Sequence, residues 1–262
     1  MAEIFRRVEK KYILDQSQYE KIKLAMANDM EPDQYGKSII CNIYFDSKDY
    51  ELVRHSITKP FYKDKVRLRS YNTPKDENSK VYLEIKRKCD KIVGKRRIEL
   101  TLRDFYNYMN GKKIESQINE QIKKELDYYF KFYNLEPKMY VSYEREAYYQ
   151  KGNADFRVTF DSNIISRKEN LNLEKGSYGE NILPKRKYIM ELKTLGTIPL
   201  WLVKIINELN IKPAVFSKYE TAYTELILNK EDAINQIDSL EYRIGKKYAE
   251  KRSVCSIWKI WR

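Results

Sequence analysis

Charged and apolar residues alternate along several short segments, and this alternation limits what the chain can fold into. In the segment 65–71, a period of two places Lys65, Arg67 and Arg69 on one face and Val66 and Leu68 on the other. An amphipathic helix would repeat every 3.6 residues instead. The pattern therefore predicts β-strands with one apolar and one charged face.

The same alternation recurs in most of the predicted strands, with Arg, Lys and Glu as the usual polar choice. The members that share faces are Glu84, Lys86 and Lys88; Lys95, Arg97 and Glu99; Tyr143 and Arg145; Arg157, Thr159 and Asp161; Glu191 and Lys193; and Arg7, Glu9 and Lys11. In a single strand this describes any solvated face of an antiparallel sheet. The repeated use of charged residues, with few Ser, Thr or Gln, points to a function for that face.

Strands and helices follow from hydrophobic periodicity and capping residues. Strands are predicted at 4–13, 39–45, 65–71, 80–88, 94–102, 138–148, 154–161 and 187–194. Helices are predicted at 16–28, 47–55, 103–111, 114–133, 199–209, 216–228 and 231–250, and a long loop at 166–186. Asp15 or Ser17 is a suitable N-cap, and Pro199 suits a first turn. Short connections favour an antiparallel meander over a doubly wound parallel sheet, and eight strands can close a barrel. The predicted class is α+β, mainly antiparallel β.

The charged face is expected to point into the barrel, because the amphipathic helices can cover the apolar face. Enclosed cations are costly without water and a counter-anion, and Arg and Lys are the residues that bind phosphate oxygens. Carboxylates among them suit a hard divalent cation. The net charge of +13 agrees with an acidic partner, although a coding bias, which the many Asn, Ile and Tyr residues also indicate, is an equal explanation of the bulk value.

Several other classes of protein are disfavoured. The chain has one histidine, His55, which is too few for a histidine metal cluster and makes a Ser/His/Asp triad improbable. His55 is expected to be a packed or surface residue. Cys41, Cys89 and Cys255 have no paired spacing. Together with a start that lacks an apolar leader, they predict a cytoplasmic location. No apolar run approaches the roughly 20 residues of a membrane span.

Short motifs along the chain resemble the VTC domain of the triphosphate tunnel metalloenzyme (CYTH-like) superfamily. In order, they are Arg7-x-Glu9-x-Lys11-Tyr12, Tyr44-Phe-Asp-Ser47, Arg67-Leu-Arg69, Glu84-Ile-Lys86, Tyr143-x-Arg145, Arg157-Val-x-x-Asp161, Glu191-Leu-Lys193 and Phe216-Ser-Lys-Tyr219. The resemblance extends from about residue 4 to 228. We therefore expect a tunnel domain over 1–230, followed by a helix and a basic tail over 231–262.

The resemblance implies an eight-stranded closed tunnel and an ATP-dependent polyphosphate polymerase that uses Mn²⁺ or Mg²⁺. The residues that it implies for phosphate contact are Arg67, Arg69, Lys86, Lys95, Arg97, Arg145, Arg157, Lys193, Ser217 and Lys218, with Lys11, Lys88 and Tyr143 as further substrate-binding residues. Glu191 resembles the metal-binding glutamate, and Glu9, Glu84 and Glu99 are further candidates. Related hydrolases and cyclases begin Glu-x-Glu-x-Lys, so Arg7 replaces one metal ligand and weakens a hydrolytic interpretation.

Other functions and partners remain open at this point. A tunnel-type triphosphatase acting on inorganic triphosphate or nucleotides is one alternative. A binding module for polyphosphate or nucleic acid is another, because tyrosines interleaved with basic residues suit single strands. Tyrosines such as Tyr106 and Tyr129 fall in predicted helices, however, where they are typical packing residues, and no specific nucleic acid is expected. In the tail, Trp258 and Trp261 at helical spacing suit either a membrane surface or contact with the barrel.

Overall fold

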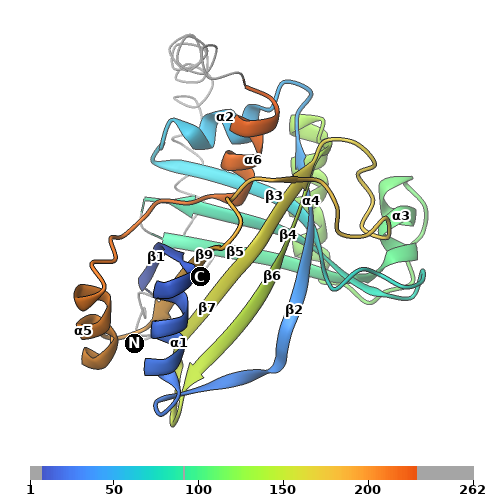
Figure 1. Ribbon diagram of the computed structural model, residues 1–262. Coiled ribbons are helices and arrows are strands. Elements are labelled where there is room, and N and C mark those ends of the chain that lie inside the picture. Colours follow the sequence, from blue (N-terminus) through green and yellow to red (C-terminus); the bar gives the residue numbers. More distant parts are fainter. Residues whose placement is uncertain (1–7, 91, 229–262) are drawn as a thin grey trace.

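One large antiparallel sheet forms the centre of the computed structural model, which describes residues 8–90 and 92–228 (Figure 1). Its strands are β1 (Val8–Asp15), β2 (Met30–Asp46), β3 (Tyr62–Tyr71), β4 (Lys80–Cys89), β5 (Ile92–Thr101), β6 (Glu136–Gln150), β7 (Asn153–Arg167), β8 (Glu180–Asn181) and β9 (Lys187–Thr194). The main path runs β1-β9-β7-β6-β2-β3-β4-β5, and β8 pairs with β7. The predicted class, α+β with mostly antiparallel strands, is confirmed.

The sheet is open in its hydrogen bonding. Its path ends at β1 and β5, and no ladder joins these two strands within the described residues. The hydrogen-bonded closure of an eight-stranded barrel, which the sequence led us to expect, is therefore not established. Eight strands do lie on the main path, and short β8 is an addition within the segment predicted as a loop.

The sheet nevertheless curls so that its distant strands share one interior. Lys86 of β4 is close enough to Glu9 and Lys11 of β1 for their charges to influence its pKa. Five strands separate β4 from β1 along the path. A flat sheet would place such strands more than 20 Å apart, at roughly 4.8 Å per strand. The charged faces of the two sheet halves must therefore look toward each other.

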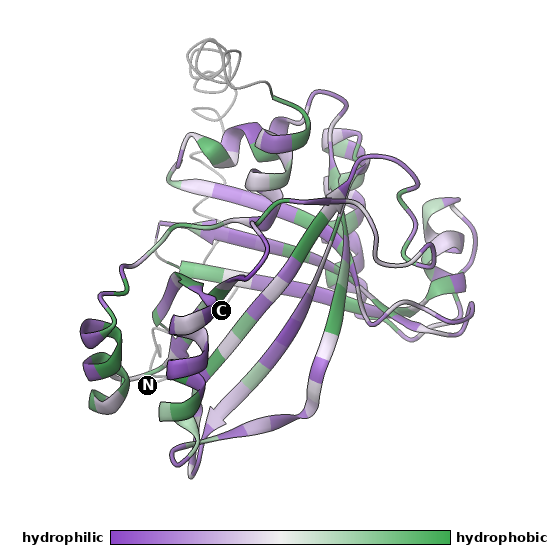
Figure 2. Ribbon diagram, in the orientation of Figure 1, coloured by the Kyte–Doolittle hydropathy of each residue, from purple (hydrophilic) through white to green (hydrophobic). Residues whose placement is uncertain are grey.

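The described part of the chain forms six helices, and the apolar strand faces pack against several of them. They are α1 (Gln16–Met26), α2 (Glu51–Ile57), α3 (Leu102–Met109), α4 (Glu120–Tyr133), α5 (Leu200–Glu208) and α6 (Lys218–Leu226). One core cluster joins α3 and α4 to β2–β5, and a second joins α1 and α5 to β1, β7 and β9. The alternation of polar and apolar residues can be followed along the strands in Figure 2. Burial of these faces is the main stabilising contribution.

A third core cluster lies inside the curl, at the end where α6 is seated. Tyr219 and Tyr223 of α6 pack among Tyr44, Met139 and Ile189, which belong to the concave face of the sheet. Tyr44 and Tyr219 stack in parallel with their ring centroids 4.4 Å apart. The concave face is thus charged along much of its length and apolar beneath α6, so α6 fills one end of the interior.

The element boundaries differ from the sequence-based predictions mainly at strand ends. β2 begins at Met30 and not at 39, and β7 continues to Arg167 and not to 161, because polar and exposed residues also join the ladders. Asp15 is the N-cap of α1 with a complete capping box, whereas Ser17 lies inside that helix. His55 is packed, with its ring Nε2 2.8 Å from the Tyr62 carbonyl oxygen. The predicted helix 231–250, Arg7, Cys255, Trp258 and Trp261 lie outside the described residues.

Candidate anion-binding site

Strand register places the predicted charged residues on one continuous concave face. Residues directly opposite in an antiparallel ladder point to the same side of the sheet. The pairs of this kind are Glu9 with Lys193, Lys11 with Glu191, Arg157 with Lys193, Thr159 with Glu191, Arg145 with Asp161, Asn42 with Arg69, Tyr44 with Arg67, Arg67 with Glu84, Lys65 with Lys86, Glu84 with Arg97 and Lys86 with Lys95. The period-two argument from sequence therefore describes the real facing of these strands.

Glu84 is the centre of charge on the β3–β5 side of the interior. Its carboxylate accepts from Arg67 Nε at 2.9 Å and lies 2.6 Å from Lys95 Nζ and 3.7 Å from an Arg97 nitrogen. Burial alone would raise the pKa of Glu84, but the charges of Arg67, Arg69 and Lys95 lower it to about 2. One buried carboxylate is thus surrounded by several cations, and positive charge remains in excess.

Arg69 extends this side of the interior toward β6. Its Nε donates to Asn42 Oδ1 at 2.9 Å, and an NH₂ group donates to the Tyr143 hydroxyl at 3.3 Å. Both partners, an amide and a phenol, are uncharged in their ordinary states and do not neutralise the guanidinium. Arg69 is 7% exposed, and a buried cation held only by neutral groups favours a bound anion.

Asp161 plays the corresponding part on the β6–β7 side. Arg145 holds it with two parallel hydrogen bonds of 2.6 and 2.8 Å, and Lys218 Nζ lies 2.5 Å from its second oxygen. Asp161 is fully buried, which would raise its pKa, yet the charges of Arg145 and Lys218 lower that pKa to about 2. The carboxylate therefore fixes two cations in position and leaves them with a net positive charge.

Glu191 lies on β9, next to β7 of this second side. Lys193 Nζ is 2.7 Å from Glu191 Oε1, and on the neighbouring strand Lys11 lies 3.3 Å from Glu9. Burial raises the pKa of Glu191, but Lys193, Lys11 and Arg145 together hold that pKa well below its usual range. Glu9 and Glu191 are thus two carboxylates on adjacent strands of one face.

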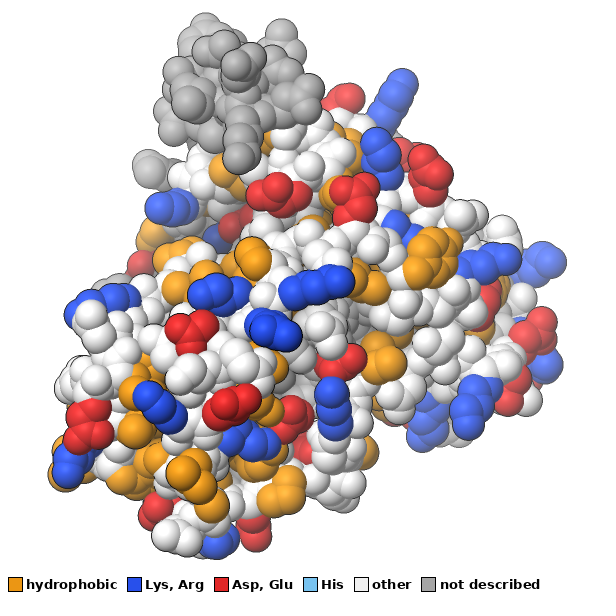
Figure 3. All heavy atoms as spheres, viewed as in Figure 1, with side chains coloured by type: hydrophobic (Ala, Val, Ile, Leu, Met, Phe, Trp, Pro, Cys, Tyr) orange, Lys and Arg blue, Asp and Glu red, His pale blue; other side chains and the backbone are white. Residues whose placement is uncertain are grey.

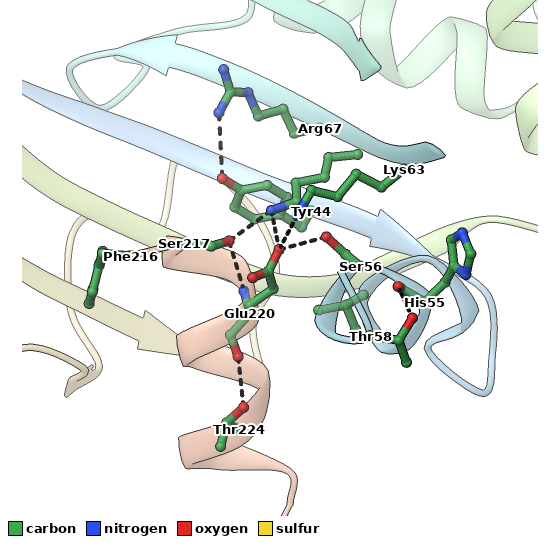
Figure 4. A network of polar contacts seen from close by, with 12 residues as sticks. Tyr44, His55, Ser56, Thr58, Lys63, Arg67, Phe216, Ser217, Glu220 and Thr224 are labelled. Atoms are coloured by element: carbon green, nitrogen blue, oxygen red, sulfur yellow. Dashed lines mark hydrogen bonds and ion pairs between the residues drawn. The ribbon is translucent and has the colours of Figure 1, made fainter. Parts of the chain in front are cut away.

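The start of α6 meets three strands that are far apart in the sheet. Lys11 of β1 donates to the Phe216 carbonyl at 3.2 Å, Lys65 of β3 donates to Ser217 Oγ at 2.7 Å, and Lys218 contacts Asp161 of β7. Figure 4 shows Ser217 and Glu220 facing the lysines of β3. The Ser217–Lys218 pair therefore lies inside the charged interior, with the amino end of the helix directed toward it.

The pKa values of Lys86 and Tyr143, both in the interior, are lowered toward pH 7. Burial and the charges of Arg67 and Lys11 lower the pKa of Lys86 to about 8, against opposing contributions from Glu9 and Glu191. For Tyr143, burial acts to raise the pKa, but Arg145, Arg69 and Lys218 lower it to about 8. Both shifts have the sign expected of a pocket with excess positive charge.

The remaining predicted residues lie nearer the rim. Glu99 is half-exposed at the edge strand β5 and pairs with Lys80, away from the buried carboxylates. Arg157 lies 3.5 Å from Asp33 of β2. Lys88 is exposed and faces Lys63 across the β3–β4 ladder. The described residues contain no group of three His, Cys, Asp or Glu side chains close enough to hold a metal by themselves.

Sequence reasoning missed several residues that the fold brings to this face. Asn42 and Tyr44 share a face with the site because β2 runs through its centre, and their period-two spacing could have indicated this. Lys63 was also missed, as was Glu220, which closes a Ser-x-x-Glu capping sequence from Ser217. The only sequence signal at Glu220 was this capping sequence. It predicts the start of a helix and gives no indication that Glu220 pairs with lysines.

One face of the outer surface carries charges of both signs. On the face shown in Figure 3, basic and acidic side chains are interspersed. Among the described helices, none has the length and apolar character that a membrane crossing requires. Cys41 and Cys89 are buried.

An interior of this kind defines an anion-binding protein built on a curled antiparallel sheet. Comparison with protein families identifies it further, because the model described as the VTC domain matches residues 6–227. The chain belongs to the VTC domain family, and the resemblance noted in its motifs is confirmed. No curated protein sequence matches the chain.

Solved structures of similar outline come from several kinds of organism. A candidate adenylate cyclase from Bacillus halodurans is 14% identical with a TM-score of 0.49, and the match covers 81% of this chain and 95% of that one. The PH1819 protein from Pyrococcus horikoshii is 17% identical with a TM-score of 0.45, covering 84% and 99%. The Mimivirus capping enzyme triphosphatase is 11% identical with a TM-score of 0.29, covering 77% and 86%.

Proposed function

We propose that this chain is a cytoplasmic polyphosphate polymerase, which transfers the γ-phosphate of ATP to a growing polyphosphate chain inside a closed tunnel. The observation that carries the proposal is the charge balance of the concave face. Each buried carboxylate there, Glu84, Asp161 or Glu191, contacts or faces at least two cations. An interior with this excess of positive charge requires a polyanion.

Cations on the two sides of the interior would hold successive phosphates. One side offers Arg67, Arg69, Lys86, Lys95 and Arg97, and the other offers Lys11, Arg145, Arg157, Lys193 and Lys218. Arginine binds phosphate oxygens through a planar fork, and lysine acts as a compact point charge. Cations on both sides suit a linear chain of phosphates better than a single small anion.

A divalent metal fits this site as a partner of the substrate. Glu191, with Glu9 beside it, supplies the hard oxygen ligands that Mg²⁺ and Mn²⁺ prefer. Two carboxylates do not make a protein cage, so phosphate oxygens and water would complete the coordination, as is usual for Mg²⁺. When bound, the metal would neutralise charge on the phosphates during transfer.

The chemistry asked of the protein itself is mainly alignment. Phosphoryl transfer needs the attacking and leaving oxygens in line and the developing charge stabilised, with no covalent nucleophile. Arg145 is held rigidly by Asp161, and Arg67 by Glu84, so these guanidinium groups are preorganised before substrate arrives. Ser217 and the amino end of α6 add neutral donors at the closed end.

Incubation of the purified protein with ATP and Mn²⁺, followed by a gel stained for polyphosphate, tests the proposal. A polymerase produces a ladder of long chains together with ADP. A tunnel-type triphosphatase produces orthophosphate only, more readily from inorganic triphosphate, and a binding module leaves ATP intact. An Arg145→Ala variant is the negative control, because it removes a transfer-site cation. If the protein makes no polyphosphate chains but cleaves triphosphate, the polymerase proposal is wrong and the hydrolase is the better assignment.

A further inference from the structure

Three lysines, Lys63, Lys65 and Lys88, form a block on β3 and β4 that adjoins Lys86 of the proposed transfer site and the start of α6. Lys63 stands opposite Lys88 in the ladder, and Lys65 stands opposite Lys86. Like charges directly opposite each other on one face destabilise a sheet. The side chains of Lys63 and Lys65 are only 23% and 19% exposed, so water screens them incompletely. This lysine block therefore favours a bound anion.

Glu220 of α6 supplies one negative charge to the lysine block. Its Oε1 lies 2.8 Å from Lys65 Nζ and 3.6 Å from Lys63 Nζ, and it accepts a 2.6 Å hydrogen bond from Ser56 Oγ (Figure 4). A single oxygen with several donors has the surroundings of a phosphate oxygen. Burial and the charges of Lys65 and Lys88 nevertheless keep the pKa of Lys63 below its usual value, so one carboxylate does not neutralise the block.

A second hydrogen-bonding position is available to the Glu220 carboxylate. In a Ser-x-x-Glu capping box the glutamate carboxylate returns to the backbone amide of the N-cap residue. Here Ser217 Oγ accepts from the Glu220 amide at 3.4 Å, but the Glu220 carboxylate extends to the lysines instead. The carboxylate can therefore leave the lysine block without breaking the helix.

The lysine block continues the row of cations that forms the proposed transfer site. Lys63, Lys65, Arg67 and Arg69 follow one another on the same face of β3. At about 3.3 Å per residue, this row is roughly 20 Å long. Because α6 fills the neighbouring interior with apolar packing, the lysine block is the charged surface that the start of that helix contacts.

We propose that the lysine block is a second phosphate subsite, which binds the part of a polyphosphate chain extending beyond the transfer site, with Glu220 occupying it until the chain arrives. The chemical class of the ligand rests on the proposed function. The subsite discriminates by length: a triphosphate held among Arg67, Arg69 and Arg97 does not need it, whereas a longer chain displaces the Glu220 carboxylate.

Equilibrium binding without turnover tests this subsite. Tripolyphosphate and a long-chain inorganic polyphosphate are titrated, in the absence of ATP, into the wild-type protein and into Glu220→Gln. Glu225→Gln is the matched control, because it changes net charge equally on an exposed position of the same helix. We expect Glu220→Gln to bind the long chain roughly three- to tenfold more tightly, with unchanged affinity for tripolyphosphate. Glu225→Gln should match the wild type.

A double variant, Lys63→Ala with Lys88→Ala, tests the same subsite from the opposite direction. It should weaken long-chain binding by roughly three- to tenfold and leave tripolyphosphate binding unchanged. Equal effects on both probes would contradict a length-selective subsite. A lower melting temperature of Glu220→Gln with unchanged affinities would show that the carboxylate only anchors α6. Because neither titration involves catalysis, failure of the polymerase assay would leave a length-selective result standing.

Discussion

Lys65 of β3 donates a 2.7 Å hydrogen bond to Ser217 at the start of α6, across a sequence separation of 152 residues. The next residue, Lys218, contacts Asp161 on β7. The amino end of α6 is therefore fixed to two strands on different sides of the interior. Small displacements of α6 would move both its serine and its lysine relative to a bound phosphate, so the position of this helix controls the geometry of the site.

Glu191→Gln should abolish most of the activity while the fold and substrate binding remain. The substitution removes the charge that a divalent ion requires but keeps a side chain of the same size next to Lys193. We expect a loss of orders of magnitude in the transfer rate, measured as ADP formed at saturating ATP and Mn²⁺. Glu99→Gln, at the half-exposed rim, should retain the wild-type rate. Full activity of Glu191→Gln at ordinary metal concentration would exclude this residue as a metal ligand.

Arg67→Ala should lower both stability and polyphosphate affinity. Glu84 is almost fully buried and would lose its closest arginine, although Lys95 and Arg97 remain. We expect a loss of about 1–3 kcal/mol in the free energy of unfolding, measured by urea denaturation. Adding Glu84→Gln should recover part of that stability, because the buried charge that lost its closest arginine is gone, but it should not recover the affinity. An additive double variant would show that Arg67 and Glu84 do not interact energetically.

Polyphosphate affinity should fall as pH rises above about 8. Near that pH, Lys86 loses a positive charge and Tyr143 gains a negative one inside the site. Lys86→Arg combined with Tyr143→Phe should flatten the pH profile of the dissociation constant between pH 7 and 9, approximately. An unchanged profile in this double variant would assign the pH dependence to other groups.

The stability of the ligand-free protein should change in the opposite direction over the same range. The pKa of Lys86 is about 8 in the folded protein and 10.5 ordinarily, so between these values the unfolded chain binds more protons. Stability that depends on Lys86 therefore rises with pH in this window, because deprotonation relieves a buried charge. Urea denaturation at several pH values measures the trend, and Lys86→Met should remove its Lys86 component.

Tyr219→Phe should loosen α6 without disturbing its packing. The Tyr219 hydroxyl donates to buried Asp46 at 2.9 Å, while its ring stacks on Tyr44. Loss of the hydroxyl leaves that carboxylate with its backbone donors only, and we expect about 1–2 kcal/mol of destabilisation by urea denaturation. Tyr128→Phe, on an exposed position of α4, is the control and should have little effect. Equal stability of Tyr219→Phe and wild type would contradict the role of this bond.

Strand facing was the part of the structure that local sequence predicted best. Lys65, Arg67 and Arg69 share the concave face, as their period-two spacing indicated, since side-chain direction along a strand depends only on neighbouring residues. The end of β7 was harder, because Ser162 and Ser166 lack the apolar signal that marks a strand. They join the ladder through partners on β6 and β8, which no local pattern reveals.

By itself, the sequence determined where the eight strands of the main path lie, which face of them is charged, and the family to which the chain belongs. Only the tertiary structure decided how the charges are partnered. That Glu84 is shared among Arg67, Lys95 and Arg97, and that Glu220 reaches the lysines of β3, follows from strand order, register and the seating of α6. Electrostatic partnership depends on distance in space, and the curl of the sheet brings together charges that the sequence keeps far apart.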